Sequence, residues 1–129
     1  MSVGHELVLI VDDNEMNVKL ARDVLRFAGF RTLEAGTGGA GVSLAIEHLP
    51  DVILMDIRLP DMEGTAAVRL LKDEPRTAKI PVVALTSFAM KGDRERFLGE
   101  GFDGYMEKPI SVREFPTQVR SYLEATKED

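Results

Sequence analysis

The chain has no cysteine and no apolar run long enough to cross a membrane. Without cysteine there are no disulfides, thiolate metal sites or cysteine nucleophiles, and nothing argues for an oxidising compartment. The first residues lack the cationic region and apolar stretch of a signal peptide, and a membrane span needs roughly 18 apolar residues. We therefore expect a cytoplasmic protein that has no membrane partner.

Positive charge is also scarce. The 129 residues include 16 Lys and Arg against 22 Asp and Glu, which gives a net charge of -6. The basic residues are scattered rather than gathered in one stripe, so the chain lacks the pattern of a protein that binds nucleic acid directly. With 44% hydrophobic residues, residues 1–129 have material for one domain and enough to bury a core without cross-links.

Three short apolar runs rich in β-branched residues predict the central strands of a parallel sheet. They are LVLIV (7–11), VILM (52–55) and IPVVAL (80–85), and such runs are typical of strands covered on both faces. Two weaker runs, RTLEA (31–35) and GYME (104–107), are predicted to be flanking strands.

Segments with helical spacing lie between these strands. The first ends at Gly29, a natural left-handed cap, and the fourth is predicted to run from about Ala89 to Leu98. The last is predicted to begin at Ser111, where Ser111 and Glu114 form a capping box, and Pro116 bends it or delays its start. Strand and helix thus alternate five times, which with right-handed crossovers predicts a doubly wound α/β sandwich. The inward-facing apolar positions are predicted to be Leu20, Ala21, Val24, Leu25 and Ala28; Val42, Ala45, Ile46 and Leu49; Ala67, Val68 and Leu71; and Phe115, Val119, Tyr122 and Leu123.

Polar residues follow the strands at the edge where open parallel sheets bind ligands. Asp12 and Asp13 follow the first strand, Asp56 ends the third, Thr86 the fourth, and Lys108 follows the fifth. Taken singly, the aspartates could be ordinary helix caps. Their convergence instead predicts a site with three carboxylates, one hydroxyl and one ammonium.

Three neighbouring carboxylates repel one another, and each resists ionisation unless a cation compensates. Magnesium takes oxygen ligands and keeps positions open for water or phosphate oxygens, so the cluster suits it better than zinc or calcium. We expect Mg²⁺ as the cofactor, with Mn²⁺ as the alternative ion. The lysine can meet a phosphoryl oxygen, so the site is predicted to contain a carboxylate nucleophile that accepts a phosphoryl group.

The segments VDDN, VILMDIRLPDMEG, VVALTSFA and YMEKPIS follow one another in this order along nearly the whole chain. On these segments the chain resembles the receiver domain of two-component response regulators. The resemblance implies a flavodoxin-like (CheY-like) fold, a five-stranded parallel sheet of order 2-1-3-4-5 with five helices in a three-layer sandwich. It also implies a single receiver domain without an output domain, which is no enzyme beyond catalysing its own phosphorylation and dephosphorylation.

The resemblance also implies a role for each residue of the site. Asp56 matches the phosphoacceptor, which takes the phosphoryl group from a phosphohistidine of a sensor histidine kinase or a histidine phosphotransfer protein. Asp13, Asp56 and the Arg58 backbone carbonyl match the metal ligands, and Asp12 acts through metal-bound water. Lys108 matches the phosphoryl-binding lysine.

Thr86 and Tyr105 match the switch pair of receivers, and the bond between Lys108 and Pro109 is expected to be cis. On phosphorylation the hydroxyl moves toward the phosphoryl group and the ring turns inward, which biases the face formed by the fourth helix, fifth strand and fifth helix. A downstream protein partner is expected to contact Met90, Lys91, Arg94, Phe97, Tyr105, Ile110 and Val112.

Three other functions share features with this one. A phosphorelay intermediate, which passes the phosphoryl group on to a histidine phosphotransfer protein, differs only in its partner and stays open. An aspartate-nucleophile phosphatase also uses clustered aspartates, but the chain lacks its D-x-D-x-[TV] pattern. The third, a nucleotide-binding module, would use Gly36, Gly38 and Gly41 of the segment GTGGAG. It is disfavoured because the segment follows a polar, edge-like strand and the chain is too short for a second half.

Three neighbours of the site are expected to modulate it. Arg58 and Phe88 lie two residues after the acceptor and the switch threonine, at positions that in receivers flank the path of the hydrolytic water. Ser87 adds a hydrogen-bonding group near the site.

We hypothesise that the bulk of Phe88 slows self-dephosphorylation. Phe88→Ala is expected to shorten the lifetime of the phosphorylated protein, measured as loss of the phosphoryl group after the donor is removed. An unchanged lifetime would refute this role.

Overall fold

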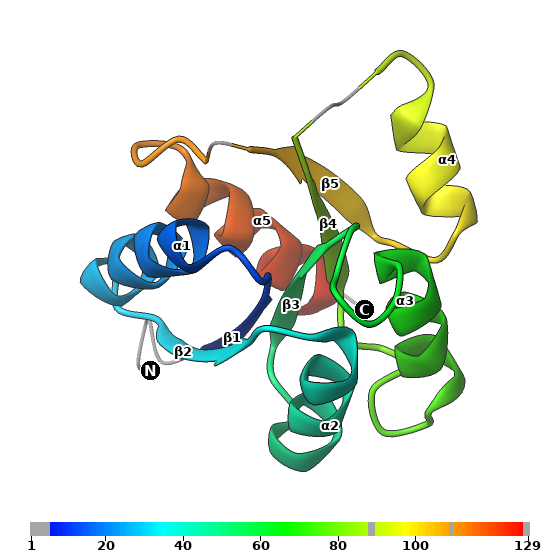
Figure 1. The fold of residues 1–129 in the computed structure, drawn as a ribbon. Helices are drawn as coiled ribbons and strands as arrows, with labels where there is room; N and C mark the ends of the chain where they lie inside the picture. The colour runs from blue at the N-terminus through cyan, green and yellow to red at the C-terminus, as the bar shows by residue number, and fades with distance from the viewer. Residues whose placement is uncertain (1–5, 88–89, 109, 128–129) are drawn as a thin grey trace.

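Strands and helices alternate along the part of the chain described by the structure, a computed structural model that covers residues 6–87, 90–108 and 110–127 (Figure 1). No helix in these ranges is both long and apolar enough to span a membrane. The elements are β1 (Leu7–Val11), α1 (Glu15–Phe27), β2 (Arg31–Ala35), α2 (Gly38–His48), β3 (Val52–Asp56), α3 (Gly64–Asp73), β4 (Val82–Thr86), α4 (Asp93–Gly99), β5 (Gly104–Glu107) and α5 (Phe115–Lys127).

The strands form one parallel sheet in the order β2-β1-β3-β4-β5, so the expected order is confirmed. Helices α1 and α5 pack on one face of the sheet, and α2, α3 and α4 pack on the other (Figure 1). Successive strand residues enter opposite layers: Val8 and Ile10 join the first core, and Leu9 and Val11 the second. The continuous apolar runs of β1, β3 and β4 are thus explained by burial on both faces.

The end of α1 follows the prediction for Gly29, which has a φ of 101°. Its amide donates to the Arg26 carbonyl at 3.0 Å, and the Phe30 amide donates to the Leu25 carbonyl at 3.0 Å. This pattern is a Schellman motif, in which the left-handed residue satisfies the last carbonyls of a helix.

The expected inward position of Leu49 is wrong. Leu49 caps α2 with a left-handed backbone (φ 49°), and 51% of the residue is exposed. The helix has already ended at this residue, so its side chain no longer follows the buried face.

Helix α4 begins at Asp93, later than the predicted start at Ala89, which lies outside the described residues. Gly92 has a φ of 91°, which is incompatible with a right-handed helix. The Asp93 carboxylate accepts the Met90 amide at 2.6 Å and closes the turn that precedes the helix.

Helix α5 likewise begins at Phe115 and not at Ser111. Ser111 Oγ accepts the Glu114 amide at 3.3 Å, and the Ser111 carbonyl accepts the Phe115 amide at 2.8 Å, so a turn leads into the helix. Pro116 then lies in the first helical turn, where a missing N–H costs no intrahelical bond. The delayed start expected from this proline is confirmed.

Candidate functional site

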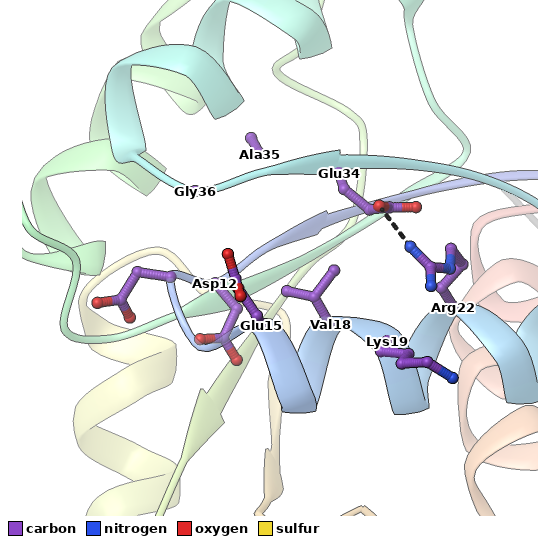
Figure 2. A pocket seen from close by; sticks show the side chains of 9 residues that line it. Asp12, Glu15, Val18, Lys19, Arg22, Glu34, Ala35 and Gly36 are labelled. Atoms are coloured by element: carbon purple, nitrogen blue, oxygen red, sulfur yellow. Dashed lines mark hydrogen bonds and ion pairs between the residues drawn. The ribbon is translucent and has the colours of Figure 1, made fainter.

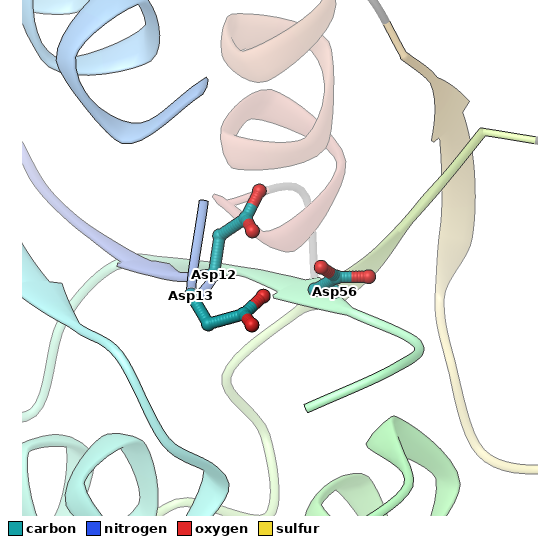
Figure 3. Close-up of side chains that lie close together, drawn as sticks. All are labelled: Asp12, Asp13 and Asp56. Atoms are coloured by element: carbon teal, nitrogen blue, oxygen red, sulfur yellow. The ribbon is translucent and has the colours of Figure 1, made fainter. Parts of the chain in front are cut away.

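The ends of β1 and β3 bring two aspartates to the same level of the sheet. Val11 is paired with Met55, so the residues that follow them, Asp12 and Asp56, lie at adjacent strand ends. Only 2% of Asp12 and 8% of Asp56 is exposed. Figure 3 shows these two side chains together with Asp13, whose carboxylate is exposed. The expected convergence of the three carboxylates is confirmed, because one oxygen from each lies within 4.8 Å of the others.

Asn14, and neither aspartate, caps helix α1. Its Oδ1 accepts the amides of Met16 at 3.0 Å and Asn17 at 3.1 Å. Asp12 Oδ1 in turn accepts the Asn14 amide at 2.9 Å. The capping requirement of α1 is thus met without Asp13, whose carboxylate accepts no hydrogen bond from the described residues.

Lys108 joins the two buried carboxylates. Its backbone amide donates to the Thr86 carbonyl at 2.7 Å, which ties the residue after β5 to the end of β4. Its Nζ lies 2.9 Å from Asp12 Oδ2 and 3.0 Å from Asp56 Oδ2. The other Asp56 oxygen accepts the Arg58 amide at 3.1 Å.

The cluster has too little positive charge for its carboxylates. Burial raises the pKa of Asp56, and the nearby Asp12 carboxylate adds to this shift, while hydrogen bonds from Arg58 and Lys108 oppose it. Burial alone would lower the pKa of Lys108, but the carboxylates of Asp12 and Asp56 raise it overall. The lysine therefore remains an ammonium, and three ionised carboxylates leave two negative charges unbalanced.

The donor set fits a hard divalent cation. Its ligand atoms are carboxylate oxygens, which Mg²⁺ prefers. Asp12 Oδ2 is fully enclosed and, within the described residues, has the ammonium as an ion-pair partner but no hydrogen bond of good geometry. A cation beside Asp13 would supply the charge that one lysine cannot.

A cleft of about 510 Å³ opens beside the cluster. Thr86 and Ser87 line it, together with Asp13, Asp56 and Lys108. Helix α4 also contributes Asp93 and Arg96, which were not predicted for this site, and their spacing of three on one helix was the available signal. Met90, which was predicted for the partner face, lines the cleft as well.

A second cavity, of about 520 Å³, lies between α1 and the end of β2 (Figure 2). Asp13 lines both cavities, so the second continues from the acidic cluster. On its other side Arg22 Nη1 lies 3.2 Å from Glu34 Oε1. The cavity therefore carries carboxylates near the cluster and an ion pair farther along α1.

The glycine segment at the start of α2 serves helix packing and the bonding of its first amides. Asp61 accepts the amides of Gly38 at 2.8 Å and Gly39 at 2.9 Å, so the amides that would hold a pyrophosphate are already bonded. A Cβ on Gly41 would lie 2.7 Å from Val11 Cγ2, so this glycine permits close contact of α2 with β1. Since β2 is also an edge strand, the nucleotide-binding alternative has no support in this geometry.

One residue of the expected partner face, Phe97, is buried and cannot contact a partner. Phe97 is only 1% exposed, because its ring packs 5.9 Å from the Phe102 ring and 5.8 Å from that of Tyr105. Tyr105 and Ile110 are half-buried. Met90, Lys91, Arg94 and Val112 are exposed, as a contact surface requires. Phe88 and Pro109, and with them the expected cis bond, lie outside the described residues.

Residues 8–120 match the family model of the response regulator receiver domain. The chain belongs to this family. The polar-differentiation response regulator DivK of Brucella ovis is 47% identical over 116 residues, which are 90% of this chain and 94% of that protein. The resemblance to receivers seen in the sequence is therefore confirmed.

Solved receiver domains have the same fold. That of the sensor histidine kinase PA1611 from Pseudomonas aeruginosa, solved with a magnesium ion in its active-site cleft, has a TM-score of 0.85 and 32% identity over 93% of this chain and 98% of that one. A CheY-like receiver domain protein from Methanospirillum hungatei has a TM-score of 0.84 and 27% identity, covering 96% and 98% of the two chains. The flavodoxin-like architecture of this receiver domain is thus confirmed.

The excess of carboxylates over cations around Asp56 predicts that Asp56→Asn stabilises the metal-free protein. The pKa of Asp56 is raised in the folded protein. In the pH window between the ordinary pKa of about 3.9 and this raised pKa, the native state therefore holds more protons than the unfolded chain. Stability is therefore lost as the pH rises through that window. We expect Asp56→Asn to raise the free energy of unfolding by on the order of 1 kcal/mol at neutral pH, and we expect this gain to shrink on acidification. Denaturant unfolding in the presence of a chelator measures it.

Asp51→Asn is the matched control, since Asp51 is an exposed aspartate at the opposite end of β3. It should give no such gain. A variant at Asp56 that is less stable than the wild type at neutral pH, or a gain independent of pH, would contradict the charge argument.

Proposed function

We propose that this receiver domain accepts a phosphoryl group on Asp56 from a phosphohistidine of a sensor histidine kinase or a histidine phosphotransfer protein. The observation that carries the proposal is the position of Lys108 Nζ, 3.0 Å from Asp56 and 2.9 Å from Asp12, with Asp13 beside them at the mouth of a cleft. This arrangement offers an anionic nucleophile, a cation for phosphoryl oxygens and free space for a donor.

The residues that would hold Mg²⁺ are Asp13, Asp56 and the Arg58 carbonyl, with Asp12 acting through water. When bound, the ion neutralises negative charge on the carboxylates and on the phosphoryl oxygens. The magnesium ion in the active-site cleft of the PA1611 receiver domain supports this assignment. Manganese offers the same charge and ligand preference, so we expect it to substitute.

Transfer requires one bond to form and one to break. A carboxylate oxygen of Asp56 attacks the phosphorus, the P–N bond to the donor imidazole breaks, and its electron pair stays on that nitrogen. Lys108 keeps its proton throughout, because its pKa is raised, and stabilises the charge on the phosphoryl oxygens. The remaining chemistry is positioning, so we regard the protein as a catalyst only of its own phosphorylation and dephosphorylation.

Phosphorylation would change the α4-β5-α5 face, which a downstream protein partner would then bind. Thr86 ends β4 in the cleft and is positioned to turn its hydroxyl toward a phosphoryl group on Asp56. Tyr105 on β5 packs against Phe97 of α4, so a shift of the ring changes the contact between these elements. A groove of about 390 Å³ along this face, lined in part by Arg94 and Tyr105, offers the space for a downstream protein partner.

Incubation with acetyl phosphate and Mg²⁺ tests the function, with intact mass as the readout. The wild type is expected to gain one phosphoryl group, and Asp56→Asn and a chelator should each abolish the gain. Asp51→Asn, at the opposite end of β3, is expected to react as the wild type does. The proposal would be wrong if the wild type gained nothing, or if Asp56→Asn gained as much.

A further inference from the structure

A short hairpin follows Asp56 and carries Arg58. Arg58 and Glu63 form an isolated antiparallel bridge, and the Leu59 amide donates to the Met62 carbonyl at 3.2 Å. The base of the hairpin is closed because the Gly64 amide donates to the Ile57 carbonyl at 2.8 Å. The geometry of Arg58 is therefore tied to that of the hairpin, residues 57–63.

The tip of this hairpin is bound to helix α2 by Asp61. Its Oδ1 accepts the Gly38 amide at 2.8 Å and its Oδ2 accepts the Gly39 amide at 2.9 Å, so both carboxylate oxygens are used. These bonds, that of Gly39 first, lower the pKa of Asp61. Helix α2 has no acidic residue in its own first turn, and Asp61 supplies the negative charge that its N-terminus favours.

Side-chain packing holds the same contact. A Cβ on Gly38 would lie 2.6 Å from Met62 Cγ and 2.8 Å from its Sδ, so the absence of a side chain at Gly38 lets the hairpin tip rest on α2. The glycine-rich segment, although it resembles a nucleotide-binding loop, thus serves to let the hairpin tip pack on α2. Two independent contacts, one polar and one apolar, join the hairpin to the helix.

The other side of the hairpin leads directly to the reacting carboxylate. The Arg58 amide donates to Asp56 Oδ1 at 3.1 Å, and the Arg58 carbonyl belongs to the same residue, which the bridge to Glu63 holds. A Cβ on Gly64 would lie 2.5 Å from the Asp56 carbonyl oxygen, so helix α3 begins in close contact with the acceptor's backbone. The segment between Asp56 and α3 is therefore held at its base, and Asp61 holds its free end.

We propose that Asp61 is a positioning residue for the phosphoryl-accepting site. By binding the first amides of α2, it fixes the hairpin that orients the Arg58 amide and carbonyl toward Asp56 and its metal. The inference rests on the proposed function, because the orientation matters only if Asp56 reacts there. Release of the tip would let the hairpin sample other conformations, and Arg58 would then be ordered at an entropic cost each time the ion binds.

Asp61→Ala removes both hydrogen bonds, and Asp51→Ala is its matched control. Asp51 is also an exposed aspartate that accepts a distant backbone amide, that of Leu7 at 2.8 Å, but at the other end of the sheet. The readouts are amide hydrogen exchange at Gly38, Gly39 and Arg58 by NMR, and the apparent dissociation constant for Mg²⁺ from amide shifts.

Asp61→Ala is expected to speed exchange at all three amides and to weaken Mg²⁺ binding roughly 3- to 10-fold. This is below the roughly 10- to 100-fold range for groups bonded directly to metal ligands, because Asp61 acts through the hairpin. Asp61→Glu, which retains the carboxylate, should restore part of the affinity. Asp51→Ala should leave the exchange of the Arg58 amide and the Mg²⁺ affinity as in the wild type, whatever it does to global stability.

Faster exchange at Gly38 and Gly39 with unchanged exchange at Arg58 and unchanged Mg²⁺ affinity would overturn the proposal, because Asp61 would then only cap α2. Failure of the proposed function looks different. In that case the wild type itself neither binds Mg²⁺ nor gains a phosphoryl group, while exchange at Arg58 still reports whether Asp61 holds the hairpin.

Discussion

Three carboxylates share a single ammonium at one edge of the sheet, and their mutual repulsion is the constraint around which this receiver domain is built. Two unit charges about 4 Å apart interact by roughly 4 kcal/mol at the effective dielectric typical near a protein surface. Lys108 compensates Asp12 and Asp56 through two short contacts, but Asp13 adds a charge that it does not meet. The site therefore carries unbalanced negative charge that a further cation would offset, as the proposed function requires.

The rest of the fold keeps these charges from moving apart. Parallel pairing places the residues after β1 and β3 side by side, and the bond from Lys108 to the Thr86 carbonyl anchors the lysine two strands away. Strands β1, β3 and β4 are buried on both faces, so a shift of one residue in register would send every side chain of such a strand into the opposite layer. The apolar core thus fixes the strand ends, and the strand ends fix the site.

Much of this could be predicted from the sequence because the signals are local. Apolar runs mark the strands, and the polar residue that follows each run must lie at the carboxyl edge, which was enough to bring Asp12, Asp56 and Lys108 together. Contacts between distant segments left no such signal. The burial of Phe97 depends on two aromatic neighbours from other elements. The acceptor of the first two amides of α2 is Asp61, more than twenty residues further along the chain.

Thermal unfolding at increasing Mg²⁺ concentration tests most directly whether the acidic cluster is a metal site. A ligand that binds only the folded state stabilises it by roughly 2.7 kcal/mol at one hundred times its dissociation constant. If the cluster binds Mg²⁺, the midpoint of unfolding rises with Mg²⁺ in the wild type and rises far less in Asp13→Asn, at constant ionic strength. A midpoint that does not respond to Mg²⁺, or that rises equally in both proteins, would contradict it.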